Sequence, residues 1–158
     1  MDAKAISDNQ RSAIIPFFWG HALSLELRDF EKDYFVHVPD YMDRLRMYAT
    51  NGSALTALVD GVPTVCWGEI PLWNGVSEFW MLGSHRLNDA PLSVSRGAMR
   101  YFNRIAVEKK LHRLQITVDM RNDVALKWAK WLKFRPEGVL RRYGPDGSDH
   151  MMFARTPK

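Results

Sequence analysis

One stretch near the C-terminus decides the fold: residues 113–134, which read RLQITVDMRNDVALKWAKWLKF. Its first seven residues alternate between polar and apolar side chains, and this period of two predicts a strand over 113–119. Asn122 can then cap a helix. The apolar stripe of that helix consists of Ala125, Trp128, Ala129 and Leu132. The stretch is therefore a strand followed closely by a helix.

The elements around this stretch follow from the same patterns. Helical spacing predicts a long helix over 91–110, and weaker patterns predict helices over 13–30 and 39–50. Strands are expected over 54–59, 64–70, 77–82, 134–143 and 149–156. Turn signals separate the strands of each hairpin, and the strongest is Asp60-Gly61, which is typical of a type I′ turn.

The order of these elements defines the fold class. The unit 77–119 is strand, helix, strand, which requires a crossover connection and predicts a parallel pair of strands. We therefore expect a single α/β domain of the mixed α+β kind over 13–158, a twisted mixed sheet flanked by helices, after a loose polar segment over 1–12. Since the chain must leave the sheet near Gly83, strands 77–83 and 113–119 should diverge in a V-shaped opening.

Composition excludes several classes of protein. The chain has 158 residues, 46% of them hydrophobic, so it can bury a core without cross-links. A single cysteine, Cys66, excludes an internal disulfide, and the five histidines show no metal-ligand spacing, so no metal is expected. No apolar run reaches the roughly 18 residues of a membrane span. The run 13–19 contains Pro16 and lacks a signal-peptide cleavage site, which favours a cytoplasmic protein.

The charges are distributed unevenly along the chain. Residues 96–142 carry thirteen Lys/Arg and four Asp/Glu, a net charge of +9, whereas residues 1–95 carry seven and twelve, a net charge of −5. A positive half beside a negative half suits an anionic ligand, either a phosphate-rich cofactor or a nucleic acid. A solvated basic helix face is the simpler interpretation of the same pattern.

The stretch 118–134 resembles the GNAT superfamily of N-acetyltransferases. It matches that family's strand, Asn, Ala three residues later, and Phe-terminated helix end, and the family's terminal hairpin fits residues 135–155. Within the superfamily the chain is similar to bacteriophage acetyltransferase-like proteins, some of them internal virion proteins. The landmarks for that similarity are residues 80–84 (WMLGS), 95–97 (SRG) and 144–147 (GPDG).

The resemblance implies an acyl-CoA-dependent transfer of an acetyl group to an amine. Acetyl-CoA would lie between strands 77–83 and 113–119, with its pantetheine held by backbone groups of Trp80, Met81 and Leu82 and by Asn122 from the other side. The long helix would present its N-terminal N–H groups to the pyrophosphate. Its first turn is expected to consist of Ser93, Val94, Ser95 and Arg96.

The chain also departs from the family pattern. Ala90, Ser93 and Ser95 stand where the family has Gln/Arg-x-x-Gly-x-Gly/Ala. Ala129 replaces the tyrosine that protonates the leaving thiolate in many members, and Lys133 replaces the glycine of the helix end. General acid catalysis contributes roughly 10²–10⁴-fold, so the departures predict weak or degenerate transferase activity.

Three side chains are candidates for catalysis. The family takes its base most often from a glutamate on or near the central strands, which points to Glu78 and Glu69. His85 follows the strand that should lie beside the thioester and could move a proton. The simpler interpretations are a strand-end carboxylate in water and a loop histidine without a role.

Three functions remain open from the sequence. The first is the acetyltransferase just described, acting on an unidentified amine. The second is a non-catalytic bacteriophage virion protein that keeps the fold and binds other virion proteins. The third is a phage enzyme that modifies nucleic acid or counters host defence, which only the charge asymmetry supports. These interpretations place the protein in the cytoplasm of an infected bacterium or in the virion.

Overall fold

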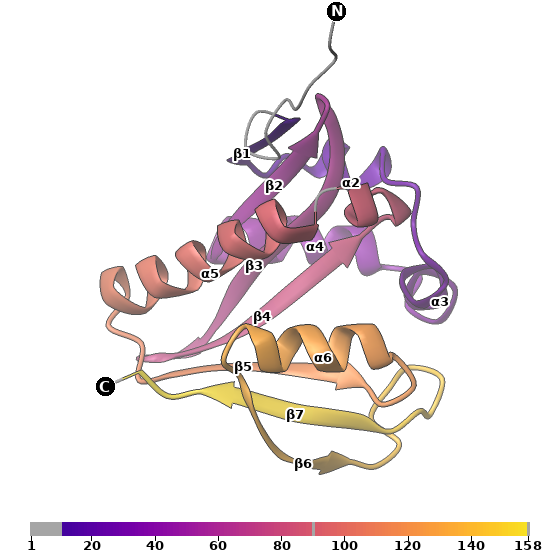
Figure 1. The fold of residues 1–158 in the computed structure, drawn as a ribbon. Helices are drawn as coiled ribbons and strands as arrows, with labels where there is room; N and C mark the ends of the chain where they lie inside the picture. The colour runs from indigo at the N-terminus through magenta and orange to yellow at the C-terminus, as the bar shows by residue number, and fades with distance from the viewer. Residues whose placement is uncertain (1–10, 90, 158) are drawn as a thin grey trace, which may run out of the picture.

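One seven-stranded sheet organises the computed structural model, which describes residues 11–89 and 91–157 (Figure 1). The strands are β1 (Ser12–Pro16), β2 (Ser53–Val59), β3 (Val62–Trp73), β4 (Val76–Gly83), β5 (Arg113–Asp119), β6 (Arg135–Leu140) and β7 (His150–Arg155). The helices are α2 (Trp19–Leu23), α3 (Asp29–His37), α4 (Tyr41–Asn51), the 3₁₀ helix η1 (His85–Asp89), α5 (Pro91–Glu108) and α6 (Asp123–Trp131).

The sheet is mixed, as the element order predicts. The strands lie in the order β1-β2-β3-β4-β5-β7-β6, and every neighbouring pair is antiparallel except β4 and β5. The parallel pair is joined by the crossover through α5. The structure therefore confirms a mixed α/β sheet with one crossover at its centre.

The β2–β3 hairpin shows why its turn was predictable. Asp60 and Gly61 both have positive φ, 51° and 77°, as a type I′ turn requires. Asp60 also forms an ion pair with Arg11, with 2.6 Å between Nη2 of Arg11 and Oδ2 of Asp60. The turn sequence and the ion pair both stabilise the first hairpin of the sheet.

Helices cover the two faces of the sheet and enclose two hydrophobic cores (Figure 1). Helices α5 and α6 pack on one face, over a core whose largest fully buried members include Trp67, Phe102 and Phe153. Helices α2 and α4 pack on the other, around Leu45, Cys66 and Leu82. Strand β4 contributes to both cores, which accounts for its nearly continuous apolar sequence.

The N-terminal prediction is wrong in part. A helix was expected over 13–30, but residues 12–16 form β1, which pairs with β2, and helix resumes only at α2 and then α3. Ile14 and Ile15 are β-branched and suit a strand, but five residues are too few for their period to be read. Residues 1–10, most of the segment expected to be loose, lie outside the described residues.

Two further findings hold for residues 11–89 and 91–157. No helix there is both long and apolar enough to cross a membrane. No group of three or more His, Cys, Asp or Glu side chains there is arranged to hold a metal ion.

Candidate functional site

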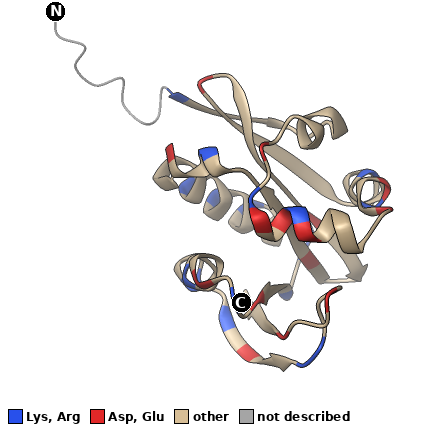
Figure 2. Cartoon of the chain, turned by 90° about the vertical axis from the view of Figure 1, so that its right-hand side faces the viewer, with Lys and Arg blue, Asp and Glu red and all other residues tan. Residues whose placement is uncertain are grey.

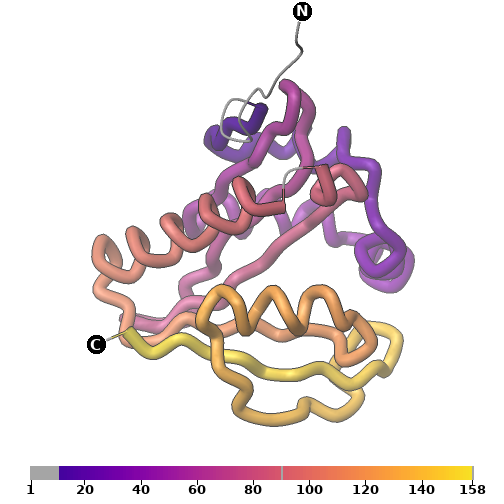
Figure 3. The backbone as a smooth tube through the Cα atoms, viewed as in Figure 1, coloured from indigo at the N-terminus to yellow at the C-terminus, as the bar shows by residue number. Residues whose placement is uncertain are grey.

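Strands β4 and β5 pair only at their amino ends. The parallel register joins Val76 to Arg113, Ser77 to Leu114 and Glu78 to Gln115, and pairing stops there. Beyond that point the two strands separate toward their carboxyl ends (Figure 3). The V-shaped opening expected between them is therefore confirmed, with its apex at Glu78 and Gln115.

A cavity of about 560 Å³ lies in this opening. Five consecutive residues of β4, 78–82, and four of β5, 116–119, line it. Successive side chains of a strand point to opposite faces, so consecutive residues can all line one cavity only along the strand's edge. The cavity therefore follows the two unpaired backbone edges, whose N–H and C=O groups can bind an extended ligand.

Glu78 is the carboxylate at the apex. Its Oε2 accepts a hydrogen bond from Nε2 of Gln115, at 3.0 Å, and the side chain lines the cavity while remaining half-buried. Gln115 is neutral, and Glu78 forms no ion pair with a cation among the described residues. An uncompensated carboxylate in a half-buried position is suited to hold an ammonium group or to accept its proton.

The other two catalytic candidates do not line the cavity. Glu69 is fully buried on β3, where it forms an ion pair with Lys109 and accepts the N–H of Ser53 at 2.9 Å. His85 is exposed in η1. The strand periodicity could not separate Glu69 from Glu78, since only the packing of α5 brings Lys109 to one of them.

The first turn of α5 differs from the expected phosphate site. The helix begins at Pro91, Val94 is buried in the core, and Arg96 is exposed. The hydroxyl of Ser95 donates to the carbonyl oxygen of Pro91 at 2.6 Å and accepts from Nε1 of Trp128 at 2.8 Å. Ser95 is thus engaged within the protein, and an anion would meet backbone groups and Arg96 instead.

Of the other predicted contacts, only Asn122 lines the cavity among the described residues. Ser93 is half-buried in the same first turn, and Ala90 lies outside the described residues. Asn122 lines the cavity and caps α6 as predicted, its Oδ1 accepting the N–H of Ala125 at 3.1 Å. Because the oxygen is used by the cap, the amide Nδ2 is the group of Asn122 that can donate to a ligand.

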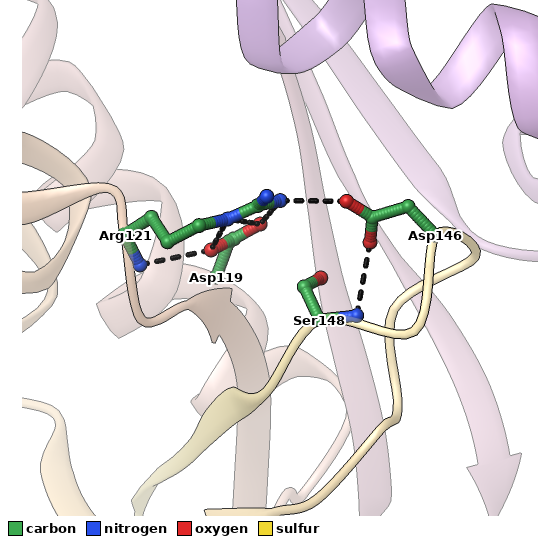
Figure 4. Close-up of polar contacts among 4 residues, drawn as sticks. All are labelled: Asp119, Arg121, Asp146 and Ser148. Carbon is green, nitrogen blue, oxygen red and sulfur yellow. Dashed lines mark hydrogen bonds and ion pairs between the residues drawn. The ribbon is translucent and has the colours of Figure 1, made fainter.

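An ion-pair cluster at the carboxyl end of β5 holds the β6–β7 loop in place (Figure 4). Nη2 of Arg121 lies 2.6 Å from Oδ2 of Asp119 and 2.8 Å from Oδ2 of Asp146. Asp146 also accepts the N–H of Ser148 at 3.0 Å. The hydrogen bonds from Ser148 and then Arg121 hold the pKa of Asp146 below its usual range, and those from Arg121 do the same for Asp119.

A second ion pair closes the β4 side of the opening. Nε of Arg28 lies 3.1 Å from both oxygens of Glu31, and Oε1 of Glu31 accepts the N–H of Gly83 at 3.4 Å. A Cβ on Gly83 would lie 2.8 Å from Nη2 of Arg28, so a side chain there would displace the guanidinium. Figure 2, which faces the carboxyl ends of β4 and β5, shows α3 with its acidic and basic residues in front of the sheet.

Sequence reasoning missed the aromatic lining. Four of the five tyrosines in the chain line the cavity: Tyr34, Tyr41, Tyr48 and Tyr143. They come from α3, α4 and the β6–β7 loop, so no local pattern joins all of them. The seven-residue separation of Tyr41 and Tyr48 places both on one helix face, and this spacing was the sequence feature that could have predicted part of the lining.

His150 is the other residue that was missed. It is 1% exposed at the start of β7, lines the cavity and lies opposite Asp119 in the register. Its ring centroid lies 5.4 Å from that of Tyr143, with the two rings tilted by 58°. Neither ring nitrogen has a hydrogen-bond partner in the described part of the chain. Burial lowers the pKa of His150 and outweighs the opposing effect of Asp119 and Asp146, so the imidazole is neutral at pH 7.

The architecture is shared with solved acetyltransferases. A GNAT-family acetyltransferase from Bacillus anthracis is 14% identical with a TM-score of 0.70, and the match covers 92% of this chain and 95% of that one. This is the GNAT fold. RimL, an α-N-protein acetyltransferase solved with coenzyme A, has a TM-score of 0.72 at 11% identity over 96% of this chain and 97% of its own. YncA from Salmonella typhimurium, with acetyl-CoA as its cofactor, has a TM-score of 0.69 at 11% identity over 92% and 94%.

Comparison of sequences adds no closer relative. No family model matches the chain, and no curated protein matches it significantly. At identities of 11–16% the structural likeness concerns the fold, so function has to be argued from the cavity itself.

Proposed function

We propose that the protein is an acyl-CoA-dependent N-acetyltransferase acting on an amine. The observation that carries the proposal is the pair of diverging strand edges that face one cavity with Glu78 at their apex. A route along two backbone edges suits the amide-containing pantetheine arm, and the carboxylate at its end suits an ammonium group. The GNAT fold of the chain supports the same conclusion.

The described residues that line the cavity fit the pantetheine part of such a cofactor. The β4 edge at Trp80, Met81 and Leu82 supplies backbone groups to the pantetheine, and Nδ2 of Asn122 can donate from the β5 side. Backbone groups in the first turn of α5, with Arg96 close by, would meet the phosphates. When bound, acetyl-CoA supplies a thioester whose carbonyl carbon bonds to the amine nitrogen as the carbon–sulfur bond breaks, giving an amide and a free thiol.

Glu78 and Tyr143 are the two residues that we assign to proton transfer, as acceptor and donor respectively. Glu78 accepts a proton from the ammonium group and leaves a neutral amine nitrogen in the cavity. Ala129 is fully buried in the core, so the position of the usual family tyrosine cannot supply an acid. The phenol of Tyr143 lines the cavity, and burial raises its pKa, which keeps it protonated at neutral pH. Tyr143 is therefore the residue we assign as the proton donor.

Two measurements test this function. We expect calorimetry to detect acetyl-CoA binding at micromolar concentration, and a thiol-release assay with an amine panel to detect turnover. Glu78→Gln should lower kcat/KM by about 10²–10⁴-fold while leaving acetyl-CoA binding unchanged. Glu26→Gln is the matched control, because Glu26 is exposed and outside the cavity. Equal losses in both variants, or no cofactor binding in the unaltered protein, would contradict the proposal.

The same experiment distinguishes the proposed transferase from the two other functions that the sequence left open. A virion protein without catalysis predicts neither cofactor binding nor thiol release. A phage enzyme acting on nucleic acid predicts cofactor-dependent modification of DNA or RNA, but no release of thiol with small amines. The charge asymmetry remains the only observation favouring that third interpretation.

A further inference from the structure

Aromatic side chains from α3, α4 and the β6–β7 loop line the cavity. Tyr34 and Tyr41 lie with ring centroids 5.5 Å apart, and Tyr48 and Tyr143 complete the lining. The fifth tyrosine, Tyr101, is buried in the core and bonded to Ser53, whereas Tyr41 and Tyr48 line the cavity and also pack against the core around Leu45. Aromatic rings attract ammonium groups by cation–π interaction and pack against other rings edge to face.

The charged side chains that line the cavity favour a cationic ligand, and none of the described lining arginines is left unpaired to bind an anion. Both arginines that line it are already paired, Arg28 with Glu31 and Arg44 with Asp40, the latter at 3.1 Å. Among the described lining carboxylates Glu31 and Asp119 are paired with arginines, whereas Glu78 is bonded only to the neutral Gln115. A carboxylate on the acceptor would therefore be desolvated without a cation to pair with it.

These two observations define a class of acceptor. We infer that the acceptor is an arylalkylamine: a primary ammonium group that binds Glu78, on an aromatic body that packs among the tyrosines, with no carboxylate of its own. The inference rests on the proposed function and specifies the substrate of the same site.

The protonation of the lining is consistent with this acceptor. Burial, with smaller effects from Tyr143, Asp119, Asp146 and Glu78, raises the pKa of Tyr34 to about 12. Burial likewise raises the pKa of Tyr41 and of Tyr143. The phenols of Tyr34, Tyr41 and Tyr143 therefore remain uncharged at neutral pH, and Glu78 is the group that selects for positive charge.

Matched amines test the inference directly. Tyramine and tyrosine share a ring and an amine and differ by one carboxylate; tyramine and n-butylamine share an ammonium and differ by the ring. We expect kcat/KM for tyramine to exceed that for each of the others by at least about tenfold. Calorimetry with tyramine alone, without cofactor, should detect binding, and the same titration with tyrosine should not.

Variants assign the selectivity to particular side chains. Tyr48→Leu should reduce the preference for tyramine over n-butylamine and leave acetyl-CoA binding unchanged, since Tyr48 belongs to α4 and not to β4 or β5, whose edges face the cofactor. Trp73→Leu is the matched control, because Trp73 is 67% exposed at the end of β3 and outside the cavity. A loss of selectivity in both variants would overturn the assignment.

The outcomes separate this inference from the proposed function. Turnover with tyrosine or n-butylamine equal to that with tyramine, or a clear preference for a peptide N-terminus, overturns the arylalkylamine while the transferase stands. Tyramine binding without any acetyl-CoA binding overturns the transferase and supports the amine site. If neither ligand binds, both proposals are overturned.

Discussion

Glu69 and Glu78 lie on neighbouring strands of one sheet, yet their surroundings differ completely. Around Glu69 the backbone of β3 is paired on both sides, and the carboxylate is matched by Lys109 and the N–H of Ser53. Around Glu78 the pairing of β4 with β5 ends, and the carboxylate meets only a neutral amide beside a cavity. The comparison teaches that the side-chain partner, a cation at Glu69 and a neutral amide beside the opening at Glu78, separates a structural carboxylate from one available for chemistry.

The strongest test of this difference is to make the same substitution at both glutamates and compare the free energies of unfolding. Glu69→Gln leaves Lys109 beside a buried neutral group, and removing one partner of a buried pair costs about 3–5 kcal/mol. We expect about 3 kcal/mol, because the Lys109 side chain is 32% exposed and keeps some hydration. Glu78→Gln should change the free energy of unfolding by less than about 0.5 kcal/mol. Urea denaturation of both variants measures the difference, and equal destabilisation would contradict the assignment.

A smaller effect is expected at the Asp119–Arg121–Asp146 cluster, which holds the loop carrying Tyr143. Arg121→Ala should lower Tm at pH 7 and increase the KM for the amine, because the loop loses its contact with β5. Arg141→Ala, an exposed residue of the same loop, is the control and should leave both unchanged.

The pH dependence of the same variant gives an independent check. The folded pKa values of Asp119 and Asp146 lie below the unfolded value of 3.8. Their contribution to stability is therefore complete above about pH 4 and is lost as the pH falls through the lowered folded values. The Tm difference between the unaltered protein and Arg121→Ala should narrow below pH 4. A difference that stays constant down to pH 2 would exclude an electrostatic origin.

The smallest effect concerns the hydrogen bond that joins α6 to α5 across the opening. Trp128→Phe keeps an aromatic ring but removes the 2.8 Å bond to Ser95, which should lower the free energy of unfolding by about 1 kcal/mol. Because Trp128 lines the cavity, acetyl-CoA should also quench its fluorescence. Trp131→Phe, on the same helix but outside the cavity, is the control for both measurements. Quenching that persists in Trp128→Phe and disappears in Trp131→Phe would contradict the placement.

Much of the fold was predictable because it depends on local patterns. Alternation along residues 113–119, the cap at Asn122 and the turn at Asp60-Gly61 all act over a few residues, and each appears in the structure as expected. The V-shaped opening was also predictable, since a crossover forces the chain out of the sheet. Strand β1 was missed because its five residues are recognisable only by their pairing with β2.

The candidate site was predictable only in part, for the same reason. Glu78, Asn122 and the β4 edge could be placed from their positions along single strands and turns. The tyrosine lining, the neutral buried His150 and the pairing of Arg28 with Glu31 bring together residues from α3, α4 and the β6–β7 loop. No periodicity connects those segments, so their meeting could not be read from spacing.

The sequence by itself determined the order and type of the elements after residue 39, the mixed sheet and the point where it opens, because hydrophobic period, caps and turns are properties of short segments. Only the tertiary structure decided which glutamate is available, which serine hydroxyl is already bonded and which tyrosines share one cavity. Those outcomes depend on contacts between residues far apart in the chain, where burial and the nearest opposite charge control the chemistry of each side chain.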